Sequence, residues 1–133
     1  MKTFVFGNTM QGLPIPAYHF GSTGPAVLIL AGVHGDEHEG VVAAYGLLNR
    51  FSKAYSYRLQ IDLVPMFNLD GVINKQRTNF NLIDLNRNLP TNDWTAEVSN
   101  ERYNPGKEPN SESENQALVA PKISCTPVST SPV

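Results

Sequence analysis

An unbroken apolar run and two periodic segments dominate the first half of the chain. Residues 27–31 are uniformly apolar and stop at Gly32, which predicts a fully buried strand. Apolar residues then recur at helical spacing and predict an amphipathic helix over residues 39–52. From residue 58 the pattern alternates, with Leu59, Ile61 and Leu63 on one face, and predicts the next strand. Strand, helix and strand in this order indicate a right-handed parallel βαβ unit.

The flanks of this unit predict further elements. Residues 3–6 and 13–20 read as two strands of an antiparallel hairpin, and Pro14 and Pro16 favour an edge position for the second strand. Residues 111–118 open a helix, where Ser111 and Glu114 match a capping box. The predicted fold class is therefore α/β, with a mixed, largely parallel sheet and flanking helices. Residues 72–109 have weak periodicity and many asparagines, and such long stretches are usually functional or disordered.

Composition fits one globular unit with a short tail. The chain has 133 residues, of which 41% are hydrophobic and 17% charged. We expect residues 1–119 to form part of one catalytic domain, and residues 120–133, rich in Pro, Ser and Thr, to form a disordered tail. The formal net charge of −2 gives no reason to expect a nucleic-acid or membrane partner. The lack of an apolar signal segment and the single cysteine, Cys125, favour a cytoplasmic location.

Candidate metal ligands follow the first buried strand. His34 and Glu37 leave the carboxyl end of that strand three residues apart, where ligands bind in open α/β sheets. An imidazole and a carboxylate are part of a His₂Glu zinc site, which uses three protein ligands and leaves one position open for water. The alternative is a plain helix N-terminus, in which Asp36 and Glu37 complement the helix dipole.

A candidate anion clamp belongs to the same edge. The second strand of the βαβ unit also ends there, and Arg77, Asn86 and Arg87 follow it in the long polar stretch. The planar guanidinium group suits a carboxylate, and the adjacent Asn86 and Arg87 could hold one anion together. The alternatives are an asparagine that caps loop backbone groups and a solvated arginine.

Taken together, these motifs resemble the zinc carboxypeptidases of the M14 (carboxypeptidase A-like) family, and within it the murein-peptide amidase and carboxypeptidase-like deacylase branch. The resemblance covers about residues 1–119. It departs from the family pattern at Leu69, where the family often has Pro, and at Leu89, where it often has an aromatic residue. The matching motifs, in the family's order, are His34-Gly-Asp-Glu37, Asn68-Leu-Asp-Gly71, Arg77, Asp84-Leu-Asn86-Arg87-Asn88-Leu-Pro90, Tyr103-Asn-Pro-Gly106 and Ser111-Glu-Ser-Glu114.

The resemblance implies a fold and a role for each candidate. The fold would be the phosphorylase/hydrolase-like zinc-peptidase fold. His34 and Glu37 would be two ligands of one Zn²⁺ ion, which would lower the pKa of its bound water. Arg77 would polarise the scissile carbonyl group and stabilise the oxyanion. Asn86 and Arg87 would hold the terminal carboxylate of a peptide or acyl-amino-acid substrate, murein peptides among them.

The family's third zinc ligand and its general base have no match in this sequence. Both would follow Glu114, and neither a histidine nor an acidic residue does. Of the other histidines, His19 belongs to a predicted edge strand and His38 to the start of a helix, so nothing but sequence proximity supports them. We therefore expect the chain to be the N-terminal, truncated portion of such an enzyme. A half-sheet would expose an apolar edge prone to self-association.

Two alternatives to a zinc metallocarboxypeptidase or amidase stay open at this point. A non-catalytic module could keep the clamp of Asn86 and Arg87 and recognise free C-terminal carboxylates. An aspartoacylase-like deacylase shares the His-x-x-Glu start and removes acyl groups from amino acids. The clamp pair and the Ser-Glu-x-Glu segment favour the peptidase branch over the deacylase branch only modestly.

Overall fold

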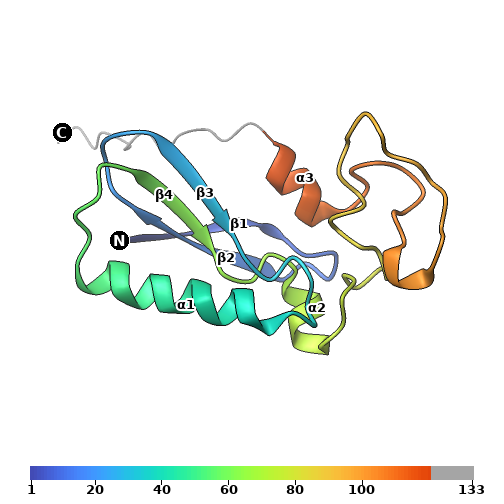
Figure 1. Cartoon of the computed structure of the whole chain (residues 1–133), viewed down its shortest axis with the longest axis horizontal. Coiled ribbons are helices and arrows are strands. Elements are labelled where there is room, and N and C mark those ends of the chain that lie inside the picture. The colour runs from blue at the N-terminus through green and yellow to red at the C-terminus, as the bar shows by residue number, and fades with distance from the viewer. Residues whose placement is uncertain (121–133) are drawn as a thin grey trace, which may run out of the picture.

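One four-stranded mixed sheet forms the centre of the computed structural model, which describes residues 1–120 (Figure 1). The strands are β1 (Lys2–Asn8), β2 (Pro14–Phe20), β3 (Ala26–Leu30) and β4 (Gln60–Val64), in the order β1-β2-β4-β3. β1 and β2 pair antiparallel, as do β2 and β4, whereas β3 and β4 are parallel. The predicted hairpin, parallel pair and mixed α/β class are confirmed. The described sheet is not largely parallel as predicted, because β2 pairs antiparallel with both of its neighbours. Almost all of the predicted tail, from residue 121, lies outside the described residues.

The prediction that β2 is an edge strand is wrong, because β2 lies between β1 and β4. The two prolines nevertheless follow the expected rule. Pro14 and Pro16 pair only with β1, and β4 pairs with β2 at residues 18–20, beyond both prolines. Proline has no backbone N–H group to donate. Both prolines lie where β2 has no second neighbouring strand, so no bond to such a strand is lost.

The prediction that residues 27–31 form a fully buried strand is also wrong. Among the described strands β3 has one neighbour, β4, and stands at the end of the sheet. Val27 and Ile29 pack towards the helix on one face, whereas the Leu28 side chain on the other face is 40% exposed. Continuous apolar strands are buried only where both faces are covered. The expected self-association through an exposed edge stays a prediction.

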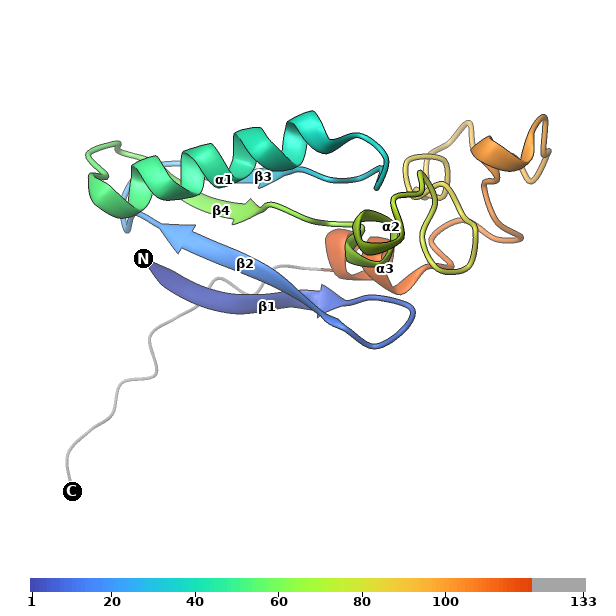
Figure 2. The ribbon, with the colours of Figure 1, turned by 90° about the horizontal axis from the view of Figure 1, so that it is seen from below.

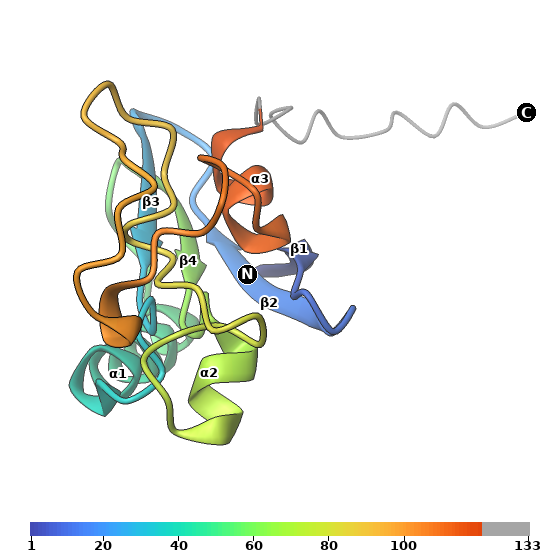
Figure 3. The same cartoon turned by 90° about the vertical axis from the view of Figure 1, so that its right-hand side faces the viewer.

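Two helices cover opposite faces of the sheet. α1 (His38–Lys53) confirms the predicted amphipathic helix and packs Ala44 and Phe51 against Phe20, Ile61 and Leu63. On the other face a second apolar cluster includes Phe6, Ile15, Val64, Phe67 and Leu85, and α3 (Ser113–Val119) adds Ala117 and Leu118. Figure 3 shows α1 and α3 on opposite sides of the strands. None of the helices described is long and apolar enough to cross a membrane.

The polar stretch after β4 folds into loops at one end of the sheet, beyond the carboxyl ends of β3 and β4 (Figure 2). It contains the short helix α2 (Leu69–Asn74), which the sequence did not predict, and the 3₁₀ turn η1 (Glu101–Tyr103). α2 begins at Asn68, whose side chain accepts a hydrogen bond from the backbone N–H of Gly71 at 3.0 Å. This capping bond supplies the start signal for so short a helix.

The predicted capping box at Ser111 and Glu114 is wrong. α3 starts two residues after Ser111, and its N-cap residue, Glu112, makes no side-chain capping bond. The Ser111 hydroxyl donates instead to Glu112, at 2.7 Å. Glu114 is fully buried and accepts from the backbone N–H of Met10, in the β1–β2 turn, at 3.2 Å. Glu114 therefore ties α3 to a loop distant in the sequence rather than capping the helix.

The buried Glu114 predicts a specific pH dependence of stability. Burial raises the pKa of its carboxyl group, and the neighbouring Glu112 adds to the rise against the hydrogen bonds from Met10 and Asn79. The folded chain therefore binds a proton at Glu114 more readily than the unfolded chain does. The stabilisation that comes from this protonation is fully present below the ordinary pKa of a glutamate. This stabilisation is lost as the pH rises through the raised pKa of Glu114.

We expect this pH dependence of stability to disappear when residue 114 can no longer ionise. Urea denaturation of the natural chain and of Glu114→Gln, measured from acidic to neutral pH, checks it. The free energy of unfolding of the natural chain should fall relative to that of the variant as pH rises. A relative rise over the same range would contradict the assignment.

Candidate active site

The loop between β3 and α1 places His34 and Glu37 side by side. The Nδ1 atom of His34 lies 3.2 Å from Oε1 of Glu37. Between them Gly35 packs directly on α2, where an added Cβ atom would lie 1.9 Å from the carbonyl carbon of Gly71. Any side chain at position 35 would therefore displace the loop, and glycine lets the two polar side chains converge.

A fully buried carboxylate, that of Asp84, anchors this pair. Its Oδ1 lies 3.1 Å from Nε2 of His34, and its Oδ2 accepts from Nε of Arg77 at 2.9 Å. Arg77 also donates from Nη1 to Oε1 of Glu37 at 3.2 Å. His34, Glu37, Arg77 and Asp84 thus form a closed ring of polar contacts, which we call the polar ring. The role of Asp84 was not predicted from the sequence, in which its only signal is its place two residues before Asn86.

The polar ring fixes the orientation of the imidazole group. A carboxylate oxygen lies beside each imidazole nitrogen, that of Asp84 at Nε2 and that of Glu37 at Nδ1. With a metal ion on Nδ1, the imidazole proton would be carried at Nε2 and donated to Asp84. One imidazole nitrogen and one carboxylate oxygen then point at a common position at the end of the sheet. This donor pair fits two of the three ligands of a His₂Glu zinc site.

The described residues contain no set of three side chains that could hold a metal ion. His19 lies away from the pair, with Nδ1 2.7 Å from Asp62 and Nε2 2.9 Å from the carbonyl oxygen of Gly21. His38 is exposed at the start of α1. Neither histidine joins His34 and Glu37 as a third ligand.

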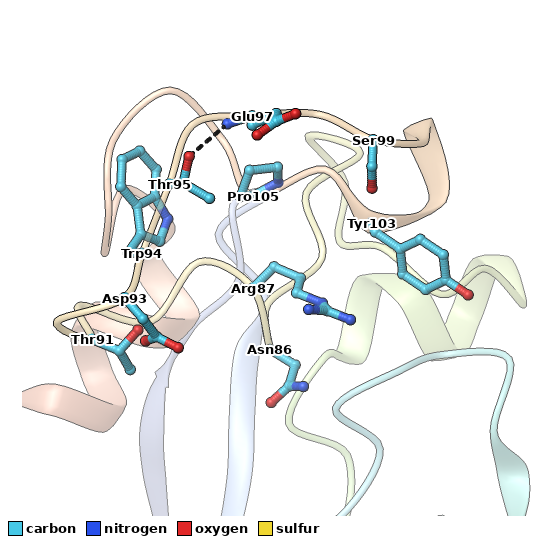
Figure 4. Close-up of a pocket in the computed structure, with 10 residues that line it drawn as sticks. All are labelled: Asn86, Arg87, Thr91, Asp93, Trp94, Thr95, Glu97, Ser99, Tyr103 and Pro105. Carbon is cyan, nitrogen blue, oxygen red and sulfur yellow. Dashed lines mark hydrogen bonds between the residues drawn. The ribbon is translucent and has the colours of Figure 1, made fainter.

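Asn86 and Arg87 lie beside the polar ring with exposed side chains. The backbone N–H of Asn86 donates to Oδ1 of Asp84 at 3.0 Å, so one carboxylate fixes both groups of residues. Together with Tyr103 and Trp94 they line an open cavity of about 580 Å³ (Figure 4). The structure therefore brings all five predicted site residues to one end of the sheet, as a contacting trio and an adjacent pair.

The segment around η1 closes one side of this site. Tyr103 lies beside both arginines, with its ring centroid 5.1 Å from Cζ of Arg77 and 5.5 Å from Cζ of Arg87. The neighbouring Arg102 donates from Nη2 to Oδ2 of Asp36, between the candidate metal ligands, at 2.9 Å. This hydrogen bond and the charge of Asp36 raise the pKa of the Arg102 guanidinium group. Tyr103 belongs to one of the matching motifs, but its contact with the arginines was not predicted from the sequence.

The fold and the motifs place the chain among proteins with a carboxypeptidase-like fold. Bovine thrombin-activatable fibrinolysis inhibitor, solved with a tick carboxypeptidase inhibitor, has the same fold: TM-score 0.77 and 21% identity over 88% of this chain and 47% of that one. The murein-tripeptide amidase of Escherichia coli O157 matches with TM-score 0.68 and 30% identity, over 89% of this chain and 54% of that one.

The family follows from the sequence match. The catalytic-domain model of the succinylglutamate desuccinylase/aspartoacylase family matches residues 23–119, so the chain belongs to that family. It is also similar to murein peptide amidase A of Escherichia coli strain K12, at 32% identity in an alignment 129 residues long that covers 85% of this chain and 50% of that protein. The chain thus spans about half the length of the curated relatives it matches. Both branches weighed from the sequence are represented among these matches, and the M14-like resemblance is confirmed.

Proposed function

We propose that this chain carries the N-terminal part of a zinc-dependent hydrolase site that cleaves an amide bond next to a free carboxylate. The observation that carries the proposal is the polar ring, in which His34, Glu37 and Arg77 converge beside the exposed pair of Asn86 and Arg87. The similarity to murein peptide amidase A supports a peptide or acyl-amino-acid substrate, murein peptides included.

His34 and Glu37 would hold the zinc ion through Nδ1 and a carboxylate oxygen, with Asp84 fixing the imidazole from behind. A bound zinc ion supplies a nucleophilic water of lowered pKa and a Lewis acid for the carbonyl oxygen. The third ligand and the general base would have to come from residues other than those of this sequence, since neither a histidine nor an acidic residue follows Glu114. Glu37 now shares Oε1 between His34 and Arg77, and it would turn that oxygen to the cation.

The two arginines would contact different groups of the substrate. Arg77 is largely buried and fixed by two carboxylates, so its guanidinium group suits the negative charge that develops on a carbonyl oxygen. Arg87 is exposed and lies beside the Asn86 amide, so the pair suits a carboxylate arriving from solvent. Binding would then depend chiefly on Arg87, and turnover chiefly on Arg77.

We expect the clamp to discriminate an acid from its amide. Isothermal titration calorimetry with an N-acetyl dipeptide and its C-terminally amidated form should show the acid binding about tenfold more tightly, since hydrogen bonds to a charged group are the stronger kind. Arg87→Met should abolish that difference, while Arg58→Met, at an exposed position before β4, should keep it. Equal binding of both forms by the natural chain would refute the clamp.

A non-catalytic module that binds C-terminal carboxylates is the second candidate. Two observations favour it: Arg87 is exposed, and the described residues lack a third metal ligand. Repeating the titration with zinc present separates the two functions. A hydrolase site predicts that zinc binds and that His34→Ala abolishes zinc binding. A simple binding module predicts that the affinity for the acid changes neither with zinc nor with His34→Ala.

The aspartoacylase-like alternative concerns the substrate. It predicts that an N-acetyl amino acid binds at least as well as the N-acetyl dipeptide in the same titration. The family match includes aspartoacylase catalytic domains and so supports testing both ligands.

A further inference from the structure

Two guanidinium groups of the site share one aromatic neighbour. The Tyr103 ring lies within 5.1 Å of Cζ of Arg77 and within 5.5 Å of Cζ of Arg87, measured to the ring centroid. The electron-rich face of an aromatic ring attracts a cation. Figure 4 shows the Tyr103 hydroxyl pointing away from Arg87, so the ring rather than the hydroxyl faces that guanidinium group.

The Tyr103 segment is tied to both sides of the site. The backbone N–H of Asp84 donates to the carbonyl oxygen of Asn104 at 2.8 Å, which joins the segment to the anchor of the polar ring. The Asn104 side chain donates to the carbonyl oxygen of Leu82 at 3.1 Å. Arg102 reaches Asp36 in the loop of the candidate metal ligands at 2.9 Å. The ring is therefore held against the arginines from two directions, although Tyr103 itself is 38% exposed.

The geometry points to Tyr103 as a positioning residue for both arginines. The Tyr103 side chain holds the guanidinium group of Arg77 within the polar ring and that of Arg87 in the lining of the cavity, so that one substrate meets both. This inference rests on the proposed function, because it assigns the two arginines to an amide carbonyl group and a carboxylate. Arg77 also has carboxylate partners, so loss of the ring should disturb Arg87 more.

The test compares Tyr103→Leu, which removes the π face, with Tyr103→Phe, which keeps it. Without any ligand, NMR signals of the arginine Nε–H groups report the ring through its ring current. The Arg87 signal should move towards the free-arginine position in Tyr103→Leu and stay in Tyr103→Phe. The preference for acid over amide should fall from about tenfold to about twofold in Tyr103→Leu and persist in Tyr103→Phe.

Phe80→Leu is the matched control, because Phe80 is an aromatic residue with an exposed side chain in the same polar stretch. It should change neither the arginine signals nor the preference. Tyr103→Gln replaces Tyr103→Leu should the leucine variant fail to fold.

The outcomes separate the inference from the proposed function. Unchanged Arg87 signals and an unchanged preference in both non-aromatic variants would overturn the positioning role. A Tyr103→Phe variant as impaired as Tyr103→Leu would overturn it too, because the hydroxyl would then be the active part. If the natural chain bound acid and amide equally, the proposed clamp would fail, and shifted arginine signals in Tyr103→Leu would still establish the ring contact.

Discussion

Replacing Asp84 with Ala should lower the free energy of unfolding by roughly 3 kcal/mol and weaken zinc binding by roughly 10–100-fold. The buried carboxylate of Asp84 contacts Nε2 of His34 and accepts hydrogen bonds from Nε of Arg77 and from the backbone N–H of Asn86. Its removal leaves a largely buried cation with one partner, Glu37, and frees the imidazole to rotate. Urea denaturation and a zinc titration against a chromophoric chelator measure the two effects.

The control for this prediction is Asp62→Ala. Asp62 pairs with His19 on the sheet, far along the chain from the site, and both side chains are about one-third exposed. Exposed pairs contribute about 0–1 kcal/mol, so we expect little loss of stability and unchanged zinc binding. A loss as small for Asp84→Ala would show that the polar ring does not depend on its anchor.

Replacing Asn88 with Ala should lower the free energy of unfolding by roughly 3–5 kcal/mol, since each buried polar group left unpaired costs about 1–3 kcal/mol. Asn88 is fully buried. Its amide nitrogen and oxygen join the segment after Arg87 to the segment before α3. The partners are the carbonyl oxygens of Pro105 and Glu108, the Ser111 hydroxyl, the Glu112 N–H and the Asn115 amide.

Asn92→Ala provides the comparison for Asn88, because Asn92 is an exposed asparagine of the same stretch. Its substitution should change stability by no more than about 0.5 kcal/mol, as surface substitutions usually do. Thermal denaturation followed by circular dichroism measures both variants. Similar midpoints for the two would mean that the loops around the site hold together without the Asn88 bonds.

Periodicity in the sequence predicted the elements that a single local pattern specifies. α1, β4 and the β1–β2 hairpin follow from the spacing of apolar residues within each segment. The same pattern misplaced β2 and β3, because strand order depends on which faces find a neighbour. An apolar strand such as β3 reads the same whether or not its far face is covered.

The site residues were predicted from chemistry and order along the chain rather than from periodicity. His34, Glu37 and Arg77 carry recognisable functional groups at a strand end, so their types predicted a shared site. Asp84 and Tyr103 could not be assigned in this way. A carboxylate and an aromatic ring in a polar loop look like ordinary loop residues until the fold brings residue 84 to residue 34 and residue 103 to residue 77.

The attachment of α3 to the start of the chain has a consequence for folding kinetics. The Ser113 hydroxyl donates to the carbonyl oxygen of Asn8 across a sequence separation of 105 residues, whereas β3, α1 and β4 are contiguous. Closing so long a loop costs more conformational entropy than closing a short one, so the contiguous unit should assemble first. The loops of the site lie between β4 and α3 in the sequence. They would then reach their native geometry only in the last stage of folding, when α3 attaches to the start of the chain.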